Sequence, residues 1–284
     1  MKTSTIKFGK YFLLSFLALG LTVSSCKKEE ENDEIQPEPT VFSHQMKKVP
    51  FIYKHTGETC YYCGDWGWPL WIGAADDNVG NALAWANYGT GYSDGTFRSE
   101  ELSTAFSTNQ DIQDNSASMS GKPSFVMNGN KITLQGSTVQ DAINGITSDV
   151  QAVNADTDID ATAAFVTSWE GDKLIVEAQA KLHKQLAGNY FMSAYVIENK
   201  AKGPQSGPNG GANVEHHYVM RGSMHTDTWG PELFNGTGES AATFNKTFEA
   251  TIPSNYIKSN ISVGVIIWKK NGTKYLWVNS ATNQ

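Results

Sequence analysis

The chain has 284 residues, of which 39% are hydrophobic, 18% are charged and three are cysteine, and its formal net charge is −7. Without residues 1–25, which hold three lysines and no acidic residue, 19 basic residues face 29 acidic ones. Such an acidic chain repels phosphate backbones, so nucleic acid is excluded as an expected partner.

The first 25 residues predict a lipoprotein signal peptide. Lys2, Lys7 and Lys10 precede an uncharged apolar run over residues 11–23, which is shorter than the about 20 residues of a membrane-spanning helix. The run ends in VSSC, where small residues precede Cys26. We expect cleavage before Cys26 and lipidation of its thiol; the alternative is an ordinary secretory peptide with an incidental cysteine.

Residues 26–46 predict a disordered tether. They begin with KKEEENDEIQPEPT after Cys26, a segment that is acidic, poor in apolar residues and interrupted by proline, so it cannot bury enough surface to fold. The tract is similar to the acidic surface-export tracts of Bacteroidota lipoproteins, and equally to a generic linker. We therefore expect a lipid-anchored protein of the outer membrane, and the cell-surface or periplasmic face stays open.

Residues 47–154 mix strand and helix signals. Strands are expected at 47–55 and 81–89, a helix at 98–106, a hairpin that turns at Asn128–Gly129, and a helix after Thr138 with Asp141 in a capping-box position. A Cys-x-x-Cys motif follows the first strand. This order predicts a thioredoxin-like α/β domain.

In a thioredoxin-like fold, a cis-proline opens the hairpin strand and lies against the dithiol. Pro123, in the sequence GKPSF, stands where that proline is expected. We therefore expect the Lys122–Pro123 bond to be cis, and the alternative is a trans proline at the start of an edge strand.

Residues 155–284 change to a succession of strands. Hairpins are expected across Glu170–Asp172 and across Asn271–Gly272, and a long Gly/Pro-rich segment, residues 200–213, predicts a functional or disordered loop. About seven strands without helical periodicity predict an antiparallel, Ig-like β-sandwich. The predicted fold class is thus α+β with two domains.

The spacing of Cys60 and Cys63 fits a structural disulfide, a redox-active dithiol or half of a zinc site. In an exported protein a disulfide persists, which favours the first. A reactive thiolate needs a helix N-terminus, but two glycines and Pro69 disfavour a long helix here, proline alone costing about 3 kcal/mol. The nearest residues whose positive charge could stabilise a thiolate are Lys54 and His55, on the preceding strand. Exposure of Cys60 at a helix N-terminus in contact with a cis-Pro123 would favour an enzyme, and burial of both sulfurs under Trp66 or Trp68 would favour a structural disulfide.

Metal and cofactor motifs are weak in this sequence. Zinc would need two ligands beyond the cysteines, and His216 and His217 point to opposite faces of a strand. His217 and His225 could meet across a hairpin, with Glu215 beside them, but two ordinary histidines explain the pattern better. We expect no metal and no cofactor.

Three tryptophans follow the cysteines: Trp66, Trp68 and Trp71. Beside glycines they could line an exposed platform for a protein or glycan ligand. The alternative is that they form the core of an irregular loop.

The motifs TGETCYYC, GKPSFVMNG and EHHYVMRGSMHTDTWGPEL together resemble those of the outer-membrane-protein-28 family of Bacteroidota lipoproteins. The resemblance covers nearly the whole mature chain and rests on Thr56, Gly57, Cys60, Cys63, Pro123, Val219, Arg221, Trp229 and Gly230. It implies an envelope lipoprotein and leaves the activity open. Gly64 replaces the family's proline, and ALAWANYG lacks the family's histidine, so both departures weaken an enzymatic interpretation.

The sequence therefore predicts a lipid-anchored outer-membrane lipoprotein that acts as a non-catalytic binding module for an unidentified protein or glycan. The alternative is a membrane-tethered thiol–disulfide oxidoreductase. In that case Cys60 would be the nucleophile, Cys63 the resolving thiol and Pro123 the residue that positions the substrate.

Overall fold

The structure is a computed structural model that describes residues 40–89, 96–97, 99–114 and 121–284. Residues 41–284 form one compact unit. The predicted signal peptide, Cys26 and most of the tether lie outside the described residues, and so does the first residue of the helix expected at 98–106.

The described residues form four α-helices and twelve strands. The helices are α1 (Tyr61–Gly64), α2 (Gly67–Asp76), α3 (Glu100–Asp114) and α4 (Val139–Ala155). The strands are β1 (Phe51–Thr56), β2 (Leu83–Tyr88), β3 (Ser124–Met127), β4 (Asn130–Lys131), β5 (Ala161–Glu170), β6 (Lys173–Leu182), β7 (Leu186–Gln205), β8 (Gly211–Ser223), β9 (Glu232–Gly238), β10 (Thr243–Thr251), β11 (Ile261–Asn271) and β12 (Lys274–Thr282).

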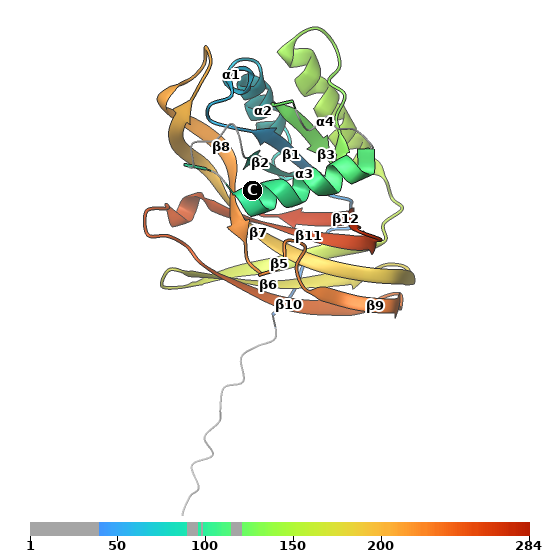
Figure 1. Cartoon of the computed structure of the whole chain (residues 1–284). Coiled ribbons are helices and arrows are strands. Elements are labelled where there is room, and N and C mark those ends of the chain that lie inside the picture. The colour runs from blue at the N-terminus through green and yellow to red at the C-terminus, as the bar shows by residue number, and fades with distance from the viewer. Residues whose placement is uncertain (1–39, 90–95, 98, 115–120) are drawn as a thin grey trace, which may run out of the picture. The chain divides into compact units, whose positions relative to one another are not determined.

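The predicted fold class, with a thioredoxin-like α/β domain and a separate antiparallel sandwich, is wrong. Instead, a nine-stranded mixed sheet runs in the order β12-β11-β7-β8-β2-β1-β3-β4, with β9 paired to β7, and a three-stranded sheet runs β10-β6-β5 (Figure 1). The two halves share the larger sheet because β8 pairs in parallel with β2, Val219 opposite Ala86.

The length of β7 and β8 explains this continuity. These strands have 20 and 13 residues, longer than the 3–10 residues that are usual. Most of residues 200–213 belong to them, so the predicted long loop is wrong. Only residues 206–210 connect the two strands, and with Gln205 we call them the hairpin tip (residues 205–210).

Several local predictions are confirmed. Asn128 and Gly129 have φ values of 54° and 87° between β3 and β4, as a type I′ turn requires. Thr138 and Asp141 form both hydrogen bonds of a capping box at the start of α4. The hairpins β5–β6 and β11–β12 turn where Gly171 and Gly272 supply positive φ.

Three hydrophobic clusters form the core. One fills the space between the three-stranded sheet and the β7–β11 part of the larger sheet, with Val176 and Val265 among its members. The other two lie on opposite faces of β1 and β2. α2 and α4 cover the face that carries Ile52, and α3 covers the face that carries Phe51 (Figure 1). This packing places the Cys-x-x-Cys segment after the end of β1, in contact with the hairpin tip.

Candidate functional site

A disulfide joins Cys60 to Cys63 at the start of α1. Cys60 is the N-cap, and its sulfur accepts a hydrogen bond from the N–H of Cys63 at 3.2 Å. α1 has only four residues, and α2 begins at Gly67 with Pro69 in its first turn, where the missing N–H costs nothing. The prediction that the glycines and Pro69 disfavour one long helix after the cysteines is confirmed.

The disulfide is buried beside the proline-led strand. Cys60 and Cys63 are 3% and 0% exposed. The Lys122–Pro123 bond is cis, as expected, and the Lys122 carbonyl oxygen lies 3.6 Å from the Cys60 sulfur. A Cβ at Gly67 would come within 2.5 Å of Pro123 Cγ, so glycine permits this close approach.

The hairpin tip holds the disulfide turn through hydrogen bonds to its backbone. The Gln205 Nε2 lies 3.1–3.2 Å from the carbonyl oxygens of Gly57, Glu58 and Cys60. The N–H of Ser206 donates to the Glu58 carbonyl at 2.7 Å. The turn itself supplies the Cys60 N–H to the Gly57 carbonyl and the Gly64 N–H to the Cys60 carbonyl, so the hairpin tip adds further donors to carbonyls that a carbonyl oxygen's second lone pair can accept.

Gly64, where the resembled family carries proline, also fits this contact. A Cβ at position 64 would lie 1.8 Å from the Ser206 carbonyl oxygen. The Asn209 N–H and side-chain amide then reach the carbonyls of Gly64 and Asp65 at 3.2 and 3.0 Å. Glycine at position 64 is therefore what allows the hairpin tip to close over α1.

Two lysines flank the disulfide. Lys54 is 4% exposed, its Nζ lies 3.4 Å from the Cys63 carbonyl oxygen, and burial lowers its pKa to about 7. Burial lowers the pKa of Lys122 to about 8, with the charge of Glu58 opposing that shift. Burial and the nearby Lys122 charge together lower the pKa of His55 to about 3, so His55 is neutral.

The sequence reasoning missed Lys122 and Gln205 as neighbours of the disulfide. Lys122 directly precedes Pro123, and the expected position of Pro123 beside the cysteines could have pointed to Lys122 as well. Gln205 lies 145 residues after Cys60, in a segment whose glycines and prolines predict a loop, and no local signal marks it.

The histidines have separate partners. Tyr88 donates its O–H to His216 Nδ1 at 2.6 Å, and His216 Nε2–H donates to the Pro204 carbonyl at 3.2 Å. Burial lowers the pKa of His216 to about 4. His217 lies 3.2 Å from Glu215, whereas His225 contacts the backbone at 227. Among the described residues no group of three or more His, Cys, Asp or Glu is arranged to hold a metal ion.

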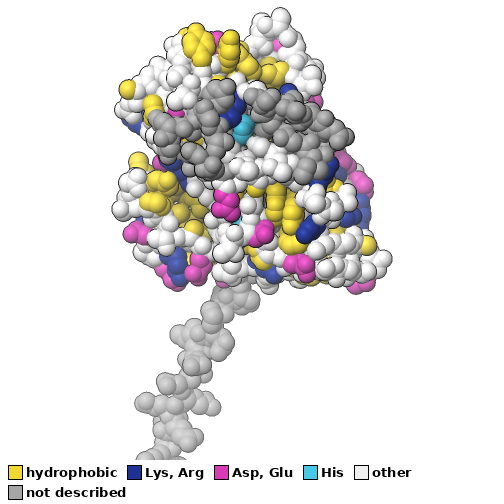
Figure 2. Space-filling view, in the orientation of Figure 1, with side chains coloured by type: hydrophobic (Ala, Val, Ile, Leu, Met, Phe, Trp, Pro, Cys, Tyr) yellow, Lys and Arg dark blue, Asp and Glu magenta, His cyan; other side chains and the backbone are white. Residues whose placement is uncertain are grey.

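The most exposed aromatic side chains here are Tyr61 and Tyr62, which are 56% and 60% exposed. Trp71 is 3% exposed and donates its indole N–H to the His217 carbonyl, which removes it from any exposed platform. Trp66 and Trp68 are partly buried against Phe125 and His216. Figure 2 shows hydrophobic side chains gathered over α1. The exposed aromatic surface thus lies between the cysteines rather than after them.

No protein-family model and no curated protein matches this sequence. Among solved structures, HBP35 of Porphyromonas gingivalis is similar at a TM-score of 0.59 and 15% identity, over 85% of this chain and 76% of that one. A domain of the outer membrane lipoprotein Omp28 from the same organism matches at a TM-score of 0.30 and 13% identity, over 44% of this chain and 87% of that one.

The likeness to HBP35 shows a shared fold over most of the chain and nothing more. The likeness to the Omp28 domain is too low to support an argument, so membership of the resembled family stays a prediction. Among the described residues, no helix has both the length and the apolar character to cross a membrane.

Proposed function

We propose that this protein is a non-catalytic binding module of the cell envelope, in which the disulfide is structural and Cys26 carries the lipid anchor. The observation that carries the proposal is the burial of both sulfurs in a turn whose carbonyls are held by Gln205. An exchange catalyst must present its first sulfur to another protein's disulfide, and this turn presents two tyrosines instead.

Tyr61 and Tyr62 form the contact surface in this proposal. Their rings are 5.6 Å apart at nearly a right angle, and the disulfide fixes the four-residue helix that carries them. Tyrosines held rigidly lose little conformational entropy on binding and can stack on either a sugar ring or an apolar protein surface. A pair of exposed, rigid tyrosines is therefore suited to the protein or glycan partner that this proposal expects.

The test of the proposal is an insulin-reduction assay driven by dithiothreitol. The protein and its Cys60→Ser/Cys63→Ser variant should give the same rate, because the disulfide does not turn over. A rate clearly above that of the variant would contradict the proposal. Metabolic labelling with a fatty-acid analogue tests the anchor: label should be lost in Cys26→Ala.

A second candidate, a membrane-tethered thiol–disulfide oxidoreductase, is favoured by one arrangement. Cys60 caps a helix, the Lys122 carbonyl that precedes the cis-Pro123 lies beside its sulfur, and the Lys54 ammonium reaches the Cys63 carbonyl. The helix N-terminus and the Lys54 ammonium would stabilise a thiolate once the disulfide is reduced. The insulin assay distinguishes the two candidates.

A further inference from the structure

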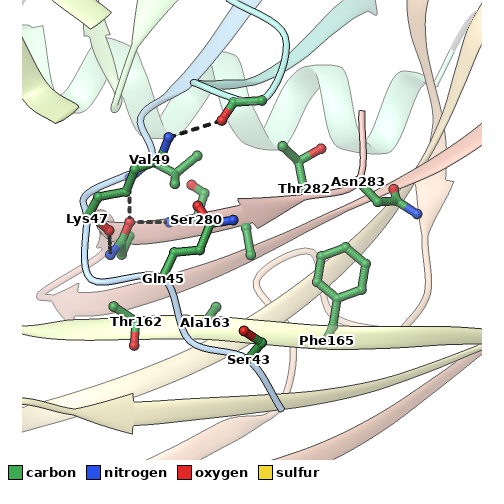
Figure 3. A pocket seen from close by; sticks show the side chains of 13 residues that line it. Ser43, Gln45, Lys47, Val49, Thr162, Ala163, Phe165, Ser280, Thr282 and Asn283 are labelled. Atoms are coloured by element: carbon green, nitrogen blue, oxygen red, sulfur yellow. Dashed lines mark hydrogen bonds between the residues drawn. The ribbon is translucent and has the colours of Figure 1, made fainter. Parts of the chain in front are cut away.

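A groove of about 570 Å³ lies between the β7–β8 hairpin and residues 255–260, which lead from β10 into β11. Its volume falls within the about 300–1,000 Å³ that is usual for small-molecule sites. A smaller cavity, of about 220 Å³, lies between β5, β12 and residues 43–49 (Figure 3). The charged residue that lines the smaller cavity, Lys47, already donates to Gly80 and Asn81 at 3.1 and 3.3 Å. The groove differs from it because it offers a charge that the protein does not use.

The groove carries more positive than negative charge. Lys200, Lys202 and Arg221 line it, and Glu198 and Glu215 oppose them. Three cations and two carboxylates leave a net charge of +1, on a chain whose formal net charge is −7. Because the rest of the chain repels anions, this local excess of positive charge favours the groove as the place where an anion binds.

Both carboxylates of the groove have a cation of their own. Arg221 donates its Nε–H and Nη2–H to Glu198 Oε2 at 2.8 and 2.5 Å, and Glu198 is 7% exposed. The Lys200 ammonium lies 3.0 Å from Glu215 Oε1. Lys202 is exposed, and within the described part of the chain no acidic group lies within ion-pair distance of it. The charge that remains for a ligand is therefore that of Lys202.

Arg221 is held in one position. Its guanidinium carbon lies 4.9 Å from the ring centroid of Phe97 and 4.7 Å from that of Tyr256, and Nη1 donates to the Thr96 carbonyl at 3.3 Å. Two aromatic faces and a buried carboxylate together restrict the guanidinium. The groove is thus built on a fixed ion pair, and Lys202 stands beside a preformed surface.

The neutral part of the lining favours a sugar over a peptide. Asn255 and Ser259 are exposed and carry an amide and a hydroxyl, groups that can both donate to and accept from sugar hydroxyls. Ile257 is 66% exposed and offers an apolar surface to the C–H face of a sugar ring. Asn260 donates its side-chain N–H to the Lys200 carbonyl, so this carbonyl at the edge of β7 is not open to an added peptide strand.

We infer that this groove binds an acidic sugar of the hexuronic acid class. The Lys202 ammonium holds the sugar's carboxylate, while Asn255 and Ser259 bind its hydroxyls. Ile257 packs against its C–H face. The groove shares no residue with the tyrosine surface of α1, so it adds a second contact site to the proposed binding module and does not depend on the role of the disulfide.

An NMR titration of the ¹⁵N-labelled protein with digalacturonate at millimolar concentrations tests the inference. The amides of Lys202, Asn255, Ile257 and Ser259 should shift along one binding curve. The uncharged methyl ester of the same disaccharide should bind about threefold or more weakly, because it lacks the ion pair with Lys202. Unchanged shifts of these amides, or equal binding of the ester, would overturn the inference. Equally tight binding of N-acetyl-aspartate methylamide would also overturn it, because the groove would then recognise a carboxylate and not a sugar.

Two lysine variants supply a matched control. Lys202→Met removes the charge and keeps most of the stem, and Lys270→Met does the same at an exposed lysine of β11 that lies outside the groove. Both side chains are exposed, so both variants should fold. Lys202→Met should weaken digalacturonate binding about threefold or more, whereas Lys270→Met should change it less than about 1.5-fold. Equal effects of the two variants would overturn the inference.

Discussion

Substitution of Gln205 by alanine should destabilise the protein by about 2–3 kcal/mol. Its amide has two N–H groups and lies within 3.2 Å of the carbonyl oxygens of Gly57, Glu58 and Cys60. Two hydrogen bonds are therefore made at a time, each worth about 1 kcal/mol net, and truncation of the buried side chain, which is 5% exposed, also loses its packing. The disulfide stays intact in this variant, so the loss reports the hairpin tip's hold on the turn.

Urea unfolding at neutral pH measures this loss through the midpoint and slope of the transition. Gln185→Ala is the control, because Gln185 also donates through its amide, at 3.0–3.2 Å, but to the exposed Glu239. The control should lie within about 0.5 kcal/mol of the unsubstituted protein. If Gln205→Ala lost no more than this control, the hairpin tip would not stabilise the turn.

Three further predictions follow from the same region. Because burial lowers the pKa of Lys54 to about 7, the unfolded chain binds the extra proton between pH 7 and about 10, so stability should rise with pH there by up to about 1.4 kcal/mol per unit. Lys54→Met should flatten this rise in urea midpoints, and an unchanged slope would contradict the assignment. His216, whose pKa burial lowers to about 4, should titrate near that value by NMR, and stability should fall as pH drops from about 6.5 toward 4; a midpoint near 6.5 would refute its burial. Gly64→Ala should cost about 1–3 kcal/mol, because its Cβ would overlap the Ser206 carbonyl, whereas Gly222→Ala, with open space around it, should cost less than about 0.5; equal urea midpoints for the two would show that the hairpin tip gives way freely.

Local signals made much of the fold predictable. The Asn128–Gly129 turn and the Thr138 capping box depend on neighbours within four residues, so composition and spacing were enough. The interruption of the helix after Cys63 was also expected, because glycine weakens a helix and proline breaks it. The cis bond before Pro123 was expected from the order of the elements around it, since an X-Pro bond is trans by default.

The pairing of the two halves was not predictable. β8 joins β2 through one register pair between Ala86 and Val219, and the Gly/Pro-rich residues 200–213 carry the local signature of a loop. Tertiary pairing overrides that signature, since the long hairpin buries Ala201 against the helical layer. The same long-range pairing brings Gln205 to the disulfide turn. Its hydrogen bonds to the carbonyls there could therefore not be predicted from the sequence either.

The reduction potential of the Cys60–Cys63 disulfide, equilibrated against glutathione, tests the central claim most directly. A structural disulfide held by the hairpin tip should have a potential below about −300 mV, because the native fold stabilises the closed turn. A value between about −120 and −270 mV would place the pair among the exchange catalysts and contradict the account.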